Sequence, residues 1–251
     1  GHGFARPDGR LGGYGMMNSP GLPLTISLVM AREAGVKDPA LDLAIERSAK
    51  LLRFYIGKGA IPYGDHHPWI ENHEDNGKCG MAAVLFNLLG ESKGAEFFSR
   101  MSVASHGAER DTGHTGNFFN MLWAMPGVAQ SGSNATGAWM SEFGSWYFDL
   151  ARGADGNFLH QGPPEPEEDS YAGWDCTGGY LLAYAMPLEK LYLTGKKPDA
   201  VPQLDAAAAQ SLIVDGRGWN NKDRNSFYDA LSDEQILERL GNWSPVVRER
   251  A

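Results

Sequence analysis

Apolar side chains recur at helical spacing along much of the chain. Between 39 and 56, Leu41, Ile45 and Leu52 belong to one apolar stripe, and basic residues lie off that stripe. Asp38 followed by Pro39 is typical of a helix start. The amphipathic pattern predicts helices over about 39–56, 92–104 and 135–152. No long alternating run indicates a strand.

A second group of segments is apolar on every side, as in Met81–Leu89 and 180–186. A helix of this kind is enclosed by other helices. Short glycine-containing turns precede helical runs at Ser19–Leu22, Lys78–Met81, His114–Asn117, Ala135–Ala138 and Cys176–Gly179. Enclosed inner helices therefore alternate with amphipathic outer helices, which predicts an all-α fold of the α/α-toroid type. Glycine at the start of an inner helix lets helix backbones approach closely.

The pattern divides the chain into a toroid domain over 1–214 and a C-terminal annex over 215–251. In the annex, Ser232 and Gln235 form a capping box, and Trp243-Ser244-Pro245 begins another helix. The last helix resembles the second helix of a HEAT-type repeat, which needs neighbours to bury its apolar face. We expect a piece of a larger protein that contacts a protein partner through these helices. The alternative is an ordinary C-terminal helix.

Two turns carry a resemblance to known families. Pro7–Tyr14 and Ala154–Phe158 are similar to the Pro-Asp-Gly-containing turns of squalene-cyclase and prenyltransferase-type α/α toroids. Residues 1–195 also resemble a bacterial toroid family of unassigned function that is often joined to HEAT-like repeats. The resemblance implies a toroid architecture. It implies no single activity, because one fold hosts many functions.

Composition narrows the functional class. The 22 basic and 31 acidic residues give a net charge of −9, which argues against a nucleic-acid binder. No apolar run is long enough for a transmembrane segment. Two cysteines are too few for a disulfide scaffold. Composition therefore indicates a globular protein. The toroid resemblance implies that its partner is a polysaccharide or another small-molecule substrate.

Parallel inner helices would bring their N-termini to one mouth, together with the long connections that precede them. The residues expected to act in catalysis there are Asp75, Asp111, His114, Tyr171 and Asp175. Those expected to bind substrate are His66, His67, Trp69, Arg110 and Trp174. Several helix N-termini pointing at one cavity would also favour an anionic group.

Cys79, His114 and Cys176 form a candidate zinc site, with a fourth position open to water or Asp175. Prenyltransferases use an Asp, a Cys and a His, and lanthionine cyclases use two Cys and a His. This chain has neither the Asp-x-Cys pair nor the Cys-His dipeptide of those families. Plain packing of the two thiols, or a disulfide between them, remains open at this point.

Two functional hypotheses follow. The first is an enzyme at the toroid mouth, a polysaccharide hydrolase or lyase that is zinc-dependent if the cysteines bind metal. The second is a non-catalytic scaffold that binds a protein or a glycan. The Asp-x-Asp-Asp motif of squalene cyclases, the thioester motif of complement-type toroids and a phosphate-binding loop are all missing from the sequence.

Overall fold

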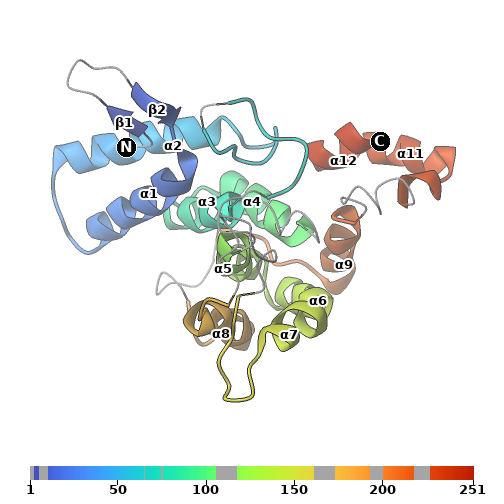
Figure 1. Ribbon diagram of the computed structural model, residues 1–251. Coiled ribbons are helices and arrows are strands. Elements are labelled where there is room, and N and C mark those ends of the chain that lie inside the picture. Colours follow the sequence, from blue (N-terminus) through green and yellow to red (C-terminus); the bar gives the residue numbers. More distant parts are fainter. Residues whose placement is uncertain are drawn as a thin grey trace.

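The computed structural model describes residues 3–5, 11–64, 66–74, 76–105, 118–160, 173–192, 200–217 and 227–251 (Figure 1). The described part of the chain is all-α apart from one short hairpin, as the sequence predicts. The strands are β1 (Gly3–Ala5) and β2 (Leu11–Met16). The principal helices are α1 (Asn18–Glu33), α2 (Pro39–Arg53), α3 (Lys78–Leu88), α4 (Ser92–Ala104), α5 (Phe118–Val128), α6 (Ser133–Phe143), α8 (Thr177–Ala185), α9 (Ala206–Asp215), α11 (Asp233–Leu240) and α12 (Pro245–Arg250).

Shorter helical pieces join these elements. A 3-10 turn, Ala129–Ser131, follows α5, and another, Met186–Leu188, follows α8. A π-helical segment, Gly144–Phe148, and the short α7 (Asp149–Ala151) continue α6. The predicted helix over 135–152 is therefore one run of three segments, with a π-helical stretch between two α-helical ones.

The antiparallel pair of β1 and β2 is the one regular element that the sequence pattern did not predict. Gly3 pairs with Met16 and Ala5 with Leu11, with a register shift after Gly3. Because β2 contains three glycines, it lacks the alternation of apolar and polar residues by which strands are recognised.

Helices α1 and α2 form an antiparallel hairpin at one side of the molecule, and α9, α11 and α12 lie at the other side (Figure 1). Between them, α3 packs against α1, α4 and α5. Every residue of α3 from Lys78 to Asn87 is buried. The helix is therefore enclosed, as its all-round apolar sequence predicts.

Helices α3 and α5 run parallel. Gly77 lies against the Phe119 carbonyl, and Gly80, one turn further on, lies against Trp123. Helix α4 is antiparallel to α5, because Ser99 Oγ donates to Gly127 O (2.8 Å) while Ser102 Oγ donates to Ala124 O (3.3 Å).

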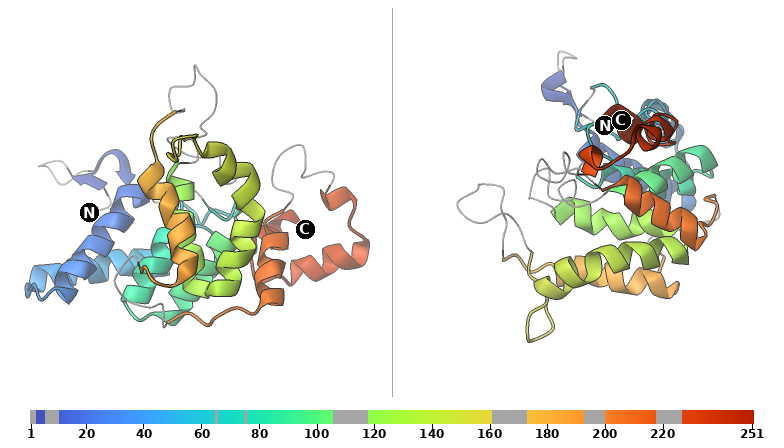
Figure 2. Two further views of the ribbon diagram at one scale, coloured as in Figure 1. Left: turned by 90° about the horizontal axis from the view of Figure 1, so that it is seen from below. Right: turned by 90° about the vertical axis from the view of Figure 1, so that its right-hand side faces the viewer.

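The first turn of α8 approaches the second turn of α5, since a Cβ on Gly179 would lie 3.0 Å from Leu122 Cδ1. The right-hand view of Figure 2 shows this part of the chain as a stack of helices lying side by side. Helices α3, α5 and α8 thus begin at one end, with α4 and α6 as partners on the outside.

Two other expected inner helices are only partly enclosed. Helix α1 exposes Leu24 and Met30, and α8 exposes Leu181. The prediction that every all-apolar run is surrounded was wrong for these two helices. A helix that is apolar on all sides can be buried on every face. How many of its faces are buried depends on how many other helices pack against it.

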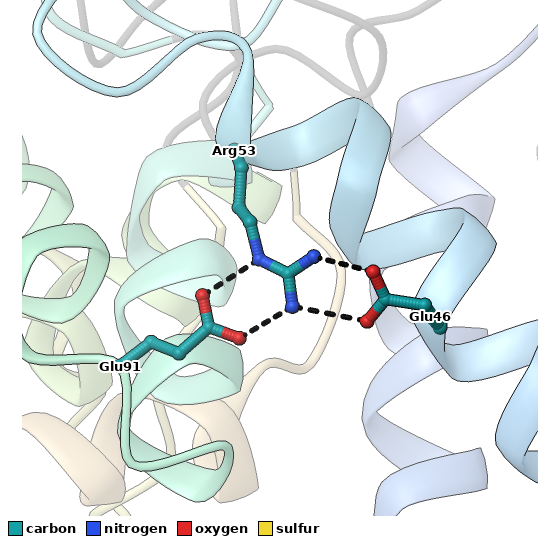
Figure 3. A network of polar contacts seen from close by, with 3 residues as sticks. All are labelled: Glu46, Arg53 and Glu91. Atoms are coloured by element: carbon teal, nitrogen blue, oxygen red, sulfur yellow. Dashed lines mark hydrogen bonds and ion pairs between the residues drawn. The ribbon is translucent and has the colours of Figure 1, made fainter.

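Helix α2 is fastened to the turn between α3 and α4 by a single guanidinium group (Figure 3). Arg53 donates to both carboxylate oxygens of Glu91 (2.8 and 2.7 Å) and to both of Glu46 (2.9 and 3.2 Å). These bonds raise the pKa of Arg53 and lower that of Glu46. Bidentate pairing of this kind fixes orientation as well as distance.

The C-terminal annex divides into a buried and an exposed helix. Ser244 caps α12, and Val246 and Val247 of that helix are fully buried. Helix α11 has the predicted Ser232–Gln235 capping box but buries no residue. The described buried side chains form two apolar clusters, one around α1 to α4 and one around α5 to α8. Trp243, which lies between α11 and α12, packs against both clusters. None of the described helices is both long and apolar enough to cross a membrane.

Candidate functional site

The start of α3 is organised by a buried carboxylate. Glu74 is fully buried, and its two oxygens accept from Cys79 N (2.8 Å) and Gly80 N (3.0 Å). The chain turns into the helix through left-handed conformations at Asn76 and Gly77. Asn120, at the start of α5, accepts the Gly77 amide through Oδ1 (2.5 Å) and so joins the two helix starts.

The start of α8 carries exposed groups. Asp175 accepts from Thr177 N (3.0 Å), and its hydrogen bonds with Thr177 lower the pKa of its carboxyl. Trp174 is 50% exposed, and its carbonyl accepts the His160 amide (2.8 Å). Two consecutive residues just before α8 therefore carry an exposed indole and an ionised carboxylate.

A buried chain of three polar side chains lies behind this pair. His160 Nδ1 is 3.0 Å from Tyr180 Oη, which is 2.7 Å from Tyr147 Oη. The His160 ring also meets the Phe118 ring edge-on. Burial raises the pKa of Tyr180, so its hydroxyl stays protonated at any physiological pH. The hydrogen bond to Tyr180 and the contact with Phe118 thus hold the His160 ring in place between α5 and α8.

The expected preference for an anion at the helix starts does not hold for α3 and α8. The free amides of α3 are taken by Glu74, and a free amide of α8 is taken by Asp175. A carboxylate at a helix N-terminus offsets the positive end of the helix dipole. An added anion would therefore meet negative charge at these two positions.

Neither cysteine is in a disulfide, and both are buried. Cys79 belongs to the apolar cluster around α1 to α4, and Cys176 to the cluster around α5 to α8. Cys176 Sγ donates to Phe158 O (3.4 Å), and burial raises its pKa to about 11. A thiol in this state is a poor zinc ligand, because zinc binds the thiolate. Among the described residues, no group of three His, Cys, Asp or Glu side chains could hold a metal. His114, the third member of the predicted zinc site, lies outside the described residues.

His66, His67 and Trp69 are exposed on the connection that precedes α3. Trp69 is 37% exposed, and its backbone pairs with Ala60. Further along the same connection, His73 is fully buried against Ser244 of the annex. The predicted binding residues that the structure describes therefore belong to two segments, one before α3 and one just before α8.

The remaining predicted residues lie outside the described part of the chain. They are Asp75, Arg110, Asp111, His114 and Tyr171. Only Asp175 of the expected catalytic residues is thus described by the structure.

Sequence reasoning missed Glu74, Asn120 and His160. Glu74 had a usable signal, since an acid ahead of an apolar helical run is typical of a helix start. His160 and Tyr180 are 20 residues apart in two different segments, and that spacing carries no periodic signal.

The chain was compared with known proteins and families. No curated protein and no solved structure matches it. One family model, described as a domain of unknown function (DUF6288), matches residues 1–195, which is well over half of the chain. The chain therefore belongs to the DUF6288 family.

Proposed function

We propose that this protein is an enzyme that cleaves a polysaccharide at the end of the molecule where α3, α5 and α8 begin. The reaction is hydrolysis or elimination at a glycosidic bond. The proposal rests on the α/α-toroid resemblance of the sequence, since many such toroids act on polysaccharides. The observation that carries it in the structure is the exposed Trp174–Asp175 pair.

An exposed indole beside an ionised carboxylate suits a sugar. The flat apolar face of Trp174 supports stacking on the C–H face of a pyranose ring. The Asp175 carboxylate accepts hydrogen bonds from sugar hydroxyls. Carbohydrate sites combine these two kinds of contact, and the two residues that can make them precede α8 directly.

The state of Asp175 limits its role. Because hydrogen bonds with Thr177 lower its pKa, Asp175 is ionised at neutral pH. It is suited to act as a nucleophile or base, or to stabilise positive charge, rather than as the proton donor. The donor is one of Asp75, Asp111, His114 and Tyr171, while His66, His67, Trp69 and Arg110 extend the binding surface.

The experiment is a screen of the full chain against soluble neutral and acidic polysaccharides. Hydrolysis adds water and releases a reducing end. Elimination breaks the same bond but leaves a carbon–carbon double bond that absorbs ultraviolet light. Measuring both products on each substrate separates the two reactions.

The decisive variant is Asp175→Asn. An Asn side chain accepts a backbone amide two residues on as an Asp side chain does, so the bond from Thr177 N is kept and only the charge is lost. We expect activity to fall by roughly a hundredfold or more, because a catalytic carboxylate is removed. Trp174→Ala should raise the KM through lost stacking.

The matched control is Asp38→Asn. Asp38 is an exposed acid that accepts from Ala40 N (2.8 Å) at the start of α2, in the same local geometry. Its variant should retain wild-type activity. Equal activity of the Asp175→Asn variant and the wild type would refute the assignment of the site. A wild-type chain that cleaves none of the polysaccharides would refute the proposed activity.

A non-catalytic scaffold is the second candidate, and helix α11 favours it. Leu237 is 66% exposed, and Leu240 on the same helix is also exposed. Exposed leucines of this kind are common at protein–protein contacts. Under this function, a Leu237→Ser/Leu240→Ser double variant would lose partner binding in pull-down experiments, and Asp175→Asn would not.

A further inference from the structure

Helices α1, α3, α5 and α8 form one row in which each helix packs against the next (Figure 1). Helix α1 begins at the same end as the others. Its first residue, Asn18, donates through Nδ2 to Pro62 O (2.9 Å) and Gly64 O (2.8 Å). The Tyr63 ring between these two carbonyls lies beneath Nζ of Lys78, the first residue of α3. Among the described helices, α1 and α8 are therefore the two outer members of this row.

The outward face of α1 carries no charge. It consists of Pro20, Leu24, Ser27 and Ala31, which are three or four residues apart and so share one side of the helix. The first three are exposed, and the Ser27 hydroxyl is already bonded to Pro23 O (2.9 Å). No charged residue occurs anywhere in 18–31. We call this set the α1 face.

The outward face of α8 has the same character. It consists of Gly178, Leu181, Ala185 and Leu188, again three or four residues apart. Gly178, Leu181 and Leu188 are exposed, and a Cβ on Gly178 would meet nothing within 4 Å. No charged residue occurs in 177–188. We call this set the α8 face.

Helix α2 shows how a solvent-facing helix of this chain differs from these two. Leu43 is 51% exposed, almost as much as Leu24 at 52%. Around Leu43, however, the exposed residues of α2 are charged, namely Asp42, Glu46, Arg47 and Lys50. A helix that faces water ordinarily has such a polar side. The uncharged α1 and α8 faces are therefore suited to contact with protein.

We propose that the α8 face of one copy of this chain docks on the α1 face of a second copy. The row itself indicates this occupant. Helix α3 lies between α1 and α5, and α5 lies between α3 and α8, whereas each outer member has a described neighbour of the row on one side. An α1 helix seated on α8 would continue the row with the same kind of contact.

The two faces also complement each other in size. Gly178 and Ala185 on one face, and Ser27 and Ala31 on the other, are small residues that let helices approach closely. They leave room for the exposed leucines of the opposite face. Stacked helical arrays need a polar outer face on their end members to stay apart in solution, and neither face supplies one.

Because the two faces differ, the interface is heterologous, and a pair of copies still has one α1 face and one α8 face to offer. Association therefore continues beyond the dimer or closes into a ring. The proposal depends on the two faces alone and holds whatever reaction occurs at the helix starts.

Sedimentation velocity of the full chain over a wide range of protein concentration tests the proposal. We expect the mean mass to rise with concentration. Leu24→Glu places a charge on the α1 face, and Leu181→Glu/Leu188→Glu places charges on the α8 face. Each variant alone should associate more than about tenfold more weakly than the wild type, because a charge would be buried without a partner.

A mixture of the two variants gives the sharpest result. The Leu24→Glu chain keeps its α8 face and the double variant keeps its α1 face, so the mixture should form a one-to-one dimer and no larger species. Leu43→Glu is the matched control, since it introduces the same charge at an equally exposed leucine. It should associate like the wild type. Circular dichroism confirms that each variant is folded.

A wild type that stays monomeric at every concentration would overturn the proposal and leave the two faces to a different partner. A variant that self-associates as strongly as the wild type would also overturn it, because the substituted face would then not be needed. If a variant loses helix content, hydrogen exchange of the wild type decides. Peptides from α1 and α8 should gain protection with concentration and peptides from α2 should not; unchanged protection of α1 and α8 would refute the contact.

Discussion

Replacing Gly80 with alanine tests the close packing of α3 on α5. A Cβ at this position would clash with the Trp123 carbonyl oxygen and would lie 3.0 Å from the Trp123 carbonyl carbon. Both atoms belong to the backbone of α5, so no side-chain rotation relieves the clash. Gly127 faces Gly80 from the other helix, and a Cβ there would lie 2.5 Å from Gly80 Cα. The two helices touch backbone to backbone.

The expected cost follows from two opposing contributions. Overpacking a well-packed interior costs about 1–3 kcal/mol, and a clash with rigid backbone belongs at the upper end. Alanine is favoured over glycine inside a helix by roughly 0.8–1.0 kcal/mol. The net loss in free energy of unfolding is therefore about 2 kcal/mol. For a chain of this size it corresponds to a fall in Tm of roughly 4–8 °C.

The control is Gly137→Ala in α6, where an added Cβ meets nothing within 4 Å. This variant should be stabilised by roughly 0.5–1 kcal/mol through helix propensity. Urea unfolding followed by circular dichroism measures both variants against the wild type. A Gly80→Ala variant as stable as the wild type would refute the backbone contact, and so would equal changes in the two variants.

The other predictions concern charge and thiol chemistry. Arg53→Met should lower the free energy of unfolding by about 1 kcal/mol, in a salt-dependent manner, because two carboxylates lose the half-exposed guanidinium that they share. Since Arg53 lowers the pKa of Glu46, that carboxylate contributes stability at neutral pH and loses it as the pH falls through the lowered value; the difference in Tm between the wild type and Glu46→Gln should therefore shrink below the ordinary glutamate pKa and vanish once the pH lies below the lowered one. Cys176, buried and with a pKa raised to about 11, should resist iodoacetamide at neutral pH until the chain is unfolded, as intact-mass spectrometry would show.

The sequence predicted helix starts correctly where they depend only on neighbouring residues. Asp38 with Pro39, Ser232 with Gln235, and Ser244 with Pro245 each begin a helix in the structure, because a cap depends only on the next few residues. The range predicted for α4 is the range observed.

Contacts between distant segments were harder to predict. The glycine turns illustrate this difference, since Gly80 meets the backbone of another helix while Gly137 and Gly178 have open space around them. All three have the same sequence context of a short turn before a helix. What separates them is the path of a helix more than 30 residues away along the chain, and periodicity carries no information about that path.

Side-chain direction was also beyond the pattern. Asp75 was selected from the polar segment before α3, whereas its neighbour Glu74 is the acid that the structure places on the helix start. Two adjacent acids are equivalent by composition. The left-handed turn at Asn76 and Gly77 brings the Glu74 carboxylate to the amides, while Asp75 lies outside the described residues.

The carboxylates at the helix starts bear on which glycans the proposed enzyme accepts. Glu74 and Asp175 occupy the amide positions where an anionic ligand would otherwise bind, and the whole chain carries a net charge of −9. Elimination acts on polysaccharides made of uronic acids, which are polyanions and would be repelled by this surface. Hydrolysis has no such requirement and can use a neutral glycan. We therefore expect reducing ends to appear with neutral polysaccharides first. Double-bond absorbance with a polyuronate, without cleavage of neutral glycans, would contradict this electrostatic reasoning.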